Sequence, residues 1–178
     1  TIVDLSLDNY KNSILKASYQ KTSNDNYLKI FDLTSPILPI NNDVLESIIE
    51  LDLEHENYDL TTSFEAHETL KGSSTDRYQY VFPSYNFSKN FYLENVAGSL
   101  NFNSYGNNTL RDTNIKTSTL FNDLEYSSLN TFLDNGIKTN FEISLKNVNT
   151  VGKNNPQYEA SPQSELMSAY IYNASLPM

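Results

Sequence analysis

The stretch Leu45–Leu70, LESIIELDLEHENYDLTTSFEAHETL, decides the fold that we expect of this chain. Apolar side chains recur at every second position on both sides of a polar triplet, His55–Asn57, and acidic or hydroxyl side chains fill most of the positions between them. A period of two is typical of β-strands, because successive side chains of a strand point to opposite faces. The triplet suits a tight turn. The stretch therefore predicts a hairpin with one apolar and one acidic face.

The predicted turn also sets an expected register for this hairpin. With His55–Asn57 as the turn, Leu53 lies opposite Tyr58 on the apolar face, and Asp52 lies opposite Asp59 on the acidic face. Each strand has about ten residues, the length that a tilted strand needs to cross a bilayer.

The composition narrows the class of protein. A chain of 178 residues is long enough for one domain, and we expect it to be a fragment of a longer protein because it starts without Met and stops just after a strand-like run. The net charge of −10 argues against nucleic acid as a partner. Cysteine is absent, so neither a disulfide nor a thiolate metal site is expected within these residues. No run approaches the roughly 18 apolar residues of a membrane helix, which leaves strands as the only expected way to span a bilayer.

The rest of the chain repeats the strand pattern, for about nine antiparallel up-and-down strands in one domain over residues 1–178. Pro83, where the alternation changes phase, predicts a β-bulge or bend, and Gly106–Asn108 is expected in a loop. The remaining predicted strands are Thr1–Leu7, Ser13–Lys21, Arg77–Ser88, Val96–Tyr105, Asn114–Tyr126, Ile137–Val148 and Ser164–Ser175, with a further short strand at 27–31.

The expected connections favour a barrel. Most are short at one end of the strands and longer at the other, as in outer-membrane β-barrels, although the connection at 127–136 departs from this rule. In a soluble β-sandwich the apolar face would pack on a second sheet, whereas in a barrel it would meet lipid. Tyrosines near strand ends favour the barrel. We therefore expect an all-β fold that forms part of a transmembrane outer-membrane β-barrel, and keep the sandwich as an alternative.

The polar face then becomes the candidate lining of a wet lumen. No nucleophile elbow, P-loop or dinucleotide fingerprint occurs, so we expect neither an enzyme nor a cofactor site. His55 and His67 are the only histidines, and two histidines without a third organised ligand favour a turn residue and a wet-face residue over a metal site. The residues expected to face the lumen are Glu50, Asp52, Asp59, Glu65, Asn101, Asn103, Lys138, Asn140 and Lys146.

Several segments resemble one known family. Asp76–Tyr85, DRYQYVFPSY, is similar to a strand with the pattern DRY-Y-x-P-x-Y/F in the alphaproteobacterial LptD family of lipopolysaccharide-assembly proteins, also called organic solvent tolerance proteins. Ser23–Leu28 resembles the Ser-Asp-x-x-Tyr-Leu segment of that family, with Asn24 in place of its Asp. Arg111–Asn114 and Leu145–Asn149 also resemble family segments, in the expected order along nearly the whole chain.

The resemblance implies a function and a set of partners. It implies a segment from the middle of an outer-membrane barrel that assembles lipopolysaccharide into the outer leaflet, located in the cell outer membrane. The implied partners are lipopolysaccharide, outer-membrane lipid, the plug lipoprotein LptE in the lumen, and the periplasmic bridge protein LptA, which would bind an N-terminal domain outside these residues. The acidic lumen wall is expected to face the plug or neutral sugar, not phosphate. A porin or receptor barrel and a soluble carbohydrate-binding β-sandwich remain alternatives.

Overall fold

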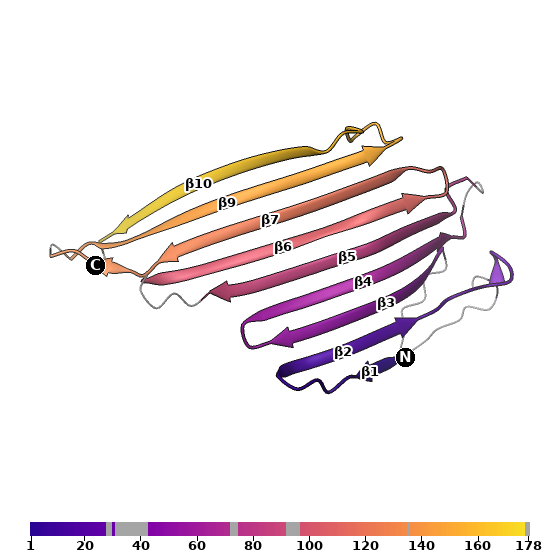
Figure 1. Cartoon of the computed structure of the whole chain (residues 1–178), viewed down its shortest axis with the longest axis horizontal. Helices are drawn as coiled ribbons and strands as arrows, with labels where there is room; N and C mark the ends of the chain where they lie inside the picture. Colours follow the sequence, from indigo (N-terminus) through magenta and orange to yellow (C-terminus); the bar gives the residue numbers. More distant parts are fainter. Residues whose placement is uncertain (28–29, 31–42, 72–74, 92–96, 135, 177–178) are drawn as a thin grey trace.

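The computed structural model describes residues 1–27, 30, 43–71, 75–91, 97–134 and 136–176. These residues form one antiparallel sheet of ten strands, which confirms the predicted all-β, up-and-down fold (Figure 1). The strands are β1 (Ile2–Asp4), β2 (Tyr10–Ser18), β3 (Val44–His55), β4 (Tyr58–Thr69), β5 (Tyr78–Phe91), β6 (Gly98–Arg111), β7 (Lys116–Ser128), β8 (Thr131–Phe132), β9 (Lys138–Lys153) and β10 (Gln163–Ser175).

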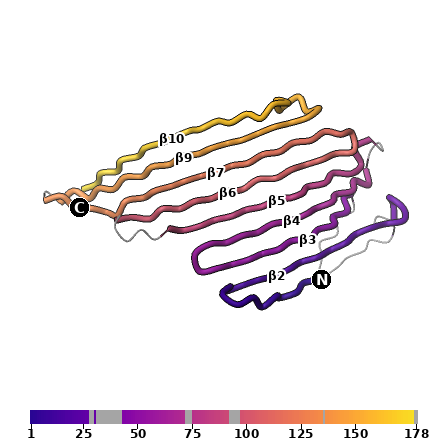
Figure 2. The backbone as a smooth tube through the Cα atoms, in the orientation of Figure 1, coloured from indigo at the N-terminus to yellow at the C-terminus, as the bar shows by residue number. Residues whose placement is uncertain are grey.

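The strands follow one another across the sheet in chain order. Nine of them form the path β1-β2-β3-β4-β5-β6-β7-β9-β10, and the two-residue β8 pairs with the start of β9, inside the long connection expected at 127–136. Figure 2 shows the backbone passing back and forth in a single open layer. Among the described residues, no helix has the length and apolar character needed for a membrane crossing. Of the short strand expected at 27–31, Tyr27 and Ile30 are described and neither lies in a strand, so the prediction was wrong there; the other three positions lie outside the described residues.

The hairpin of β3 and β4 exists, but the predicted register was wrong by two residues. Leu53 lies opposite Leu60 instead of Tyr58, and Asp52 lies opposite Thr61 instead of Asp59. The cause is the turn, because β3 continues to His55 and only two residues separate it from β4. A shift of two leaves every side chain on its predicted face.

The region around Gly106 was also predicted wrongly. The sequence suggested a loop at Gly106–Asn108, but β6 runs through it and pairs Gly106 with Leu120 of β7. A Cβ atom at Gly106 would lie 2.4 Å from the carbonyl oxygen of Thr119, so this glycine permits a close approach of two strands and not a turn. As a result, the β6–β7 connection shrinks to residues 112–115, and the expected contrast between short and long connections is weaker.

The predicted irregularity at Pro83 is confirmed. The pairing of β5 with β6 shifts between Val81 and Ser84, and the pairing of β4 with β5 shifts between Ser63 and Glu65. The bulge absorbs one residue, so Tyr80 before it and Tyr85 after it share a face although their numbers differ in parity.

The registers divide the side chains into two faces. The apolar face contains Leu15, Ala17, Leu45, Ile49, Leu51, Leu53, Leu60, Phe64, Ala66, Tyr80, Phe82, Phe87, Leu100, Phe102, Leu110, Leu120, Leu124, Phe141, Ile143, Leu145, Val151, Leu166, Tyr170 and Tyr172. The polar face contains Lys16, Glu46, Glu50, Asp52, Glu54, Asp59, Thr61, Ser63, Glu65, His67, Asn86, Ser88, Asn101, Asn103, Asp123, Glu125, Lys138, Asn140, Glu142 and Lys146.

The sheet has almost no hydrophobic core. Leu45, Leu70 and Val81 are the buried hydrophobic residues of the described chain, whereas Ile49 and Phe64, paired on the apolar face, are 56% and 53% exposed. No second sheet covers the apolar face within the described residues, because all their strands belong to one sheet.

Candidate functional site

All nine residues predicted to face a lumen lie on the polar face. On β3, Glu50 pairs with Lys16 at 2.7 Å, and on β9, Lys146 pairs with Asp123 at 3.2 Å. The remaining seven are Asp52, Asp59, Glu65, Asn101, Asn103, Lys138 and Asn140. They are spread over β3, β4, β6 and β9, so they make a wall and not a single pocket.

Two carboxylates on this wall accept hydrogen bonds from hydroxyl groups of the neighbouring strands. Asp52 accepts a hydrogen bond from the Thr61 hydroxyl at 3.0 Å, and Asp59 accepts one from Ser88 at 3.4 Å. Because the register moved by two residues, Asp52 and Asp59 do not face each other.

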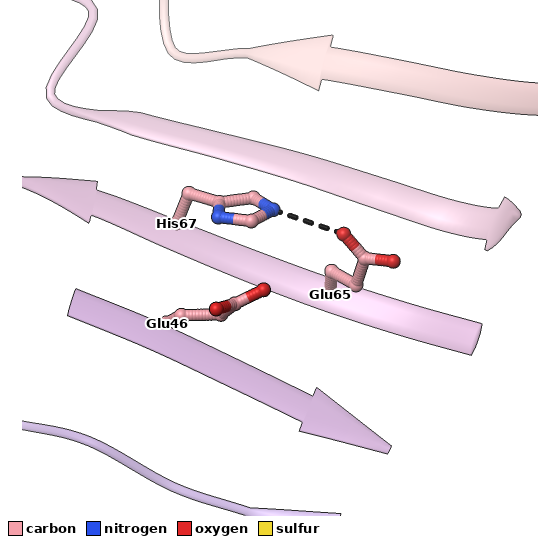
Figure 3. A group of neighbouring side chains, drawn as sticks. All are labelled: Glu46, Glu65 and His67. Carbon is pink, nitrogen blue, oxygen red and sulfur yellow. Dashed lines mark hydrogen bonds and ion pairs between the residues drawn. The ribbon is translucent and has the colours of Figure 1, made fainter. Parts of the chain in front are cut away.

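One tighter group stands on the polar face near the end of β4. Glu65 and His67 point to the same side of β4, and Glu46 of β3 lies directly opposite His67 (Figure 3). The His67 ring nitrogen Nε2 and Glu65 Oε2 are 3.0 Å apart, and the Ser63 hydroxyl donates to Glu65 Oε1 at 2.6 Å. One potential ligand atom from each of Glu46, Glu65 and His67 lies within 4.8 Å of the others.

One imidazole and two carboxylates are ligands suited to a divalent transition metal. Glu65, however, already receives hydrogen bonds from its own neighbours, and Glu46 is exposed. The interpretation of His67 as a histidine on a wet face is compatible with this arrangement and stays a prediction.

A second network lies at the end of the sheet that carries the β2–β3, β4–β5, β6–β7 and β9–β10 connections, at the right in Figure 1, which we call the loop end. Arg77 is its centre. Its guanidinium donates to both carboxylate oxygens of Asp25, at 2.7 and 3.1 Å, and its Nε donates to Glu68 at 2.8 Å. The Tyr78 hydroxyl donates to the same Glu68 oxygen at 2.9 Å. Arg77 thus ties the segment after β2 to β4.

The network continues into the β6–β7 connection. The backbone amide and the hydroxyl of Thr113 both donate to Asp76 Oδ1, and the amide of Tyr78 donates to Asp112 at 3.0 Å. Arg111 stands 3.8 Å from the other oxygen of Asp76. Three connections that are far apart in the sequence are therefore joined by charged and hydroxyl side chains.

The electrostatics of this network follow from these contacts. The hydrogen bond from the Thr113 hydroxyl, reinforced by its backbone amide and by Arg111, lowers the pKa of Asp76 below its ordinary value. The hydrogen bonds to Asp25 and Glu68 raise the pKa of the Arg77 guanidinium, which stays charged at every accessible pH.

The sequence had not suggested a polar seam that crosses the apolar face. The Tyr85 hydroxyl contacts Ser104 at 3.0 Å, Ser104 donates to Asn122 at 2.8 Å, and the Asn122 amide donates to Asn147 at 3.2 Å. Asn147 in turn donates to Ser164 at 3.1 Å. Its members satisfy one another across five strands, which lowers the cost of placing them on an apolar surface. In the sequence, these residues stand out only as single polar side chains at strand positions whose neighbours on the same face are mostly apolar.

Comparison with known proteins adds no relative. The chain matches no protein-family model and no curated protein sequence.

Proposed function

We propose that this chain is a wall segment of an outer-membrane β-barrel that takes part in lipopolysaccharide assembly, in the manner of the LptD family. The observation that carries this proposal is a single-layer sheet with one largely uncharged apolar face and one charged face. An apolar face with Ile49 and Phe64 more than half exposed needs a cover, and lipid supplies one over a whole barrel wall.

The placement of charge on the apolar face supports lipid as the cover. Its cations are Lys89 near the end of β5, and Lys116 and Lys153 at the start of β7 and the end of β9. Its one carboxylate in the paired strands, Glu68, is next to last in β4 and is paired with Arg77. Charges at strand ends would lie at the membrane–water interfaces, where they cost least.

The loop-end network supports the more specific proposal of an LptD-like barrel. Three of the four segments that resemble the family contribute to it: Asp25 from the first, Asp76, Arg77 and Tyr78 from the second, and Asp112 and Thr113 from the third. The up-and-down order of the strands brings these three segments to the same end of the sheet, where they contact one another. Under this proposal the polar face lines the lumen and contacts the plug LptE or neutral sugar.

The test is to express the full natural protein that contains these residues, fractionate the envelopes, and compare unheated with heated samples on a gel. We expect outer-membrane location, a band that shifts on heating, and co-purification with lipopolysaccharide and LptE. A heat-shifted membrane protein that retains neither partner would favour a porin or receptor barrel. A soluble protein without a shift would refute the barrel and leave the carbohydrate-binding β-sandwich.

A further inference from the structure

Two lysines face each other at the loop end of the apolar face. Lys116, the first residue of β7, and Lys153, the last residue of β9, are direct register partners. Residues opposite each other in an antiparallel pair have Cα atoms about 4.5–5.5 Å apart. Two ammonium groups held this way repel each other, and like charges directly opposite destabilise a sheet.

No carboxylate of the described chain neutralises this pair. Lys16, Lys71, Arg77 and Lys146 all have a carboxylate within ion-pair distance, whereas no ion pair joins Lys116 or Lys153 to a described residue. Lys11, Lys21, Lys89 and Lys138 also make no ion pair with a described residue, but Lys116 and Lys153 differ from them in lying directly opposite each other. Their combined positive charge has no partner within the described residues.

The two lysines border a groove of about 570 Å³. Phe82, Leu110, Val151 and Ala160 form its apolar lining, and Asn108, Thr109, Thr117 and Ser118 also line it. The groove opens onto the apolar face, because Leu110 and Val151 belong to that face. A ligand bound here meets two cations together with hydrocarbon side chains.

We propose that Lys116 and Lys153 bind the phosphate of a phosphorylated lipid whose acyl chains lie along this groove. Lysine is a common phosphate-binding residue, and its aliphatic stem can lie on an apolar surface while its ammonium group reaches the headgroup level. A free phosphate would use the lysines but not the groove, and a neutral lipid would use the groove but not the lysines. The site rests on the proposed function in one respect, that the apolar face meets a bilayer.

The experiment uses the natural protein purified from envelopes and delipidated in detergent. Native mass spectrometry would count bound phosphatidic acid against phosphatidylcholine for the unchanged protein, for the double variant Lys116→Gln and Lys153→Gln, and for a control double variant, Lys11→Gln and Lys89→Gln. The control makes the same change of charge at the opposite end of the sheet. We expect a preference for phosphatidic acid that falls roughly thirty-fold in the first variant, the ratio expected for two lysine contacts with an anionic lipid surface, and is kept in the control.

Three results would overturn the site. They are an unchanged preference in the Lys116 and Lys153 variant, an equal loss in the control, or full competition by inorganic phosphate, which would mean a free-anion site. Envelope fractionation of the same cells tests the proposed outer-membrane location independently of the lipid site. If the protein proved soluble, flotation with phosphatidylcholine vesicles, with and without phosphatidic acid, would decide the lipid site by the same variants.

Discussion

The environment of the apolar face is tested most directly by placing a charge at its centre. Ile49 lies five residues from Val44 and six from His55, the two ends of β3. With a rise of about 3.4 Å per residue and a strand tilt of about 40°, Ile49 sits about 13 Å from the nearer end of the strand, close to a bilayer midplane. Ile49→Lys should then cost about 2–4 kcal/mol of folding free energy. In water, a residue that is 56% exposed would tolerate the same change within about 0.5 kcal/mol.

The assay is urea unfolding of the full protein in phosphatidylcholine vesicles, with the unheated gel band as the measure of folded protein. The control is Asn103→Lys, which places the same charge near the middle of β6 on the polar face, next to Asp123. We expect the unfolding midpoint to fall for Ile49→Lys and to stay nearly unchanged for Asn103→Lys. Equal midpoints for the two variants would refute the assignment of the apolar face to lipid.

The remaining predictions concern the strand contact at Gly106 and the loop-end network. Gly106→Ala should destabilise the protein by about 1–3 kcal/mol, because the added Cβ meets the Thr119 carbonyl oxygen of the neighbouring backbone, and urea unfolding measures this loss. The Asp76 contact with Thr113 should persist at neutral and mildly acidic pH. It should be lost as the pH falls through the lowered pKa of Asp76, below the ordinary aspartate range near 4. The protection factor of the Thr113 amide in hydrogen exchange, followed against pH, measures this loss. Arg77→Lys should increase proteolysis of the segment after β2, because an ammonium group cannot reproduce the two-pronged contact.

Each of these predictions has a matched control. Asn107→Ala changes the neighbouring residue of β6 on the polar face and should leave stability within about 0.5 kcal/mol. Asp76→Asn should make the protection factor of the Thr113 amide, which is its exchange rate corrected for the intrinsic effect of pH, independent of pH over the acid range. A pH dependence of the protection factor that survives would assign it to another group. Arg111→Lys removes only a 3.8 Å contact, and if it exposed the segment after β2 as much as Arg77→Lys did, the role of Arg77 would be wrong.

The sequence predicted the strands and their faces well because both depend on local alternation. The period of two places Glu50 and Ile49 on opposite sides whatever their partners are, so all nine predicted polar residues lie on one face. Register is different, because a shift by two residues keeps every face and leaves no trace in the pattern. The pairing of Asp52 with Thr61 instead of Asp59 could therefore not be read from alternation alone.

The contacts that the sequence missed depend on how strands meet. Glycine is a common turn residue, so the sequence suggested a turn at Gly106. Only the short distance from its Cβ position to the Thr119 carbonyl oxygen reveals that Gly106 permits a close approach of β6 and β7. Arg77 and Asp25 are 52 residues apart, and their contact follows from the order of the strands. The resemblance pointed to both segments, but not to their contact.

The bulge at Pro83 has a consequence for how this chain can change in length. Successive residues of each strand alternate between the apolar face and the polar face. Inserting or deleting one residue within a strand would therefore exchange the two faces beyond that point. At Pro83 the ladder already contains one extra residue, so β5 changes parity there while its aromatic residues stay on the apolar face. Inherited length changes within the strands should therefore come in steps of two or beside a new bulge, whereas the connections are free to vary by any number.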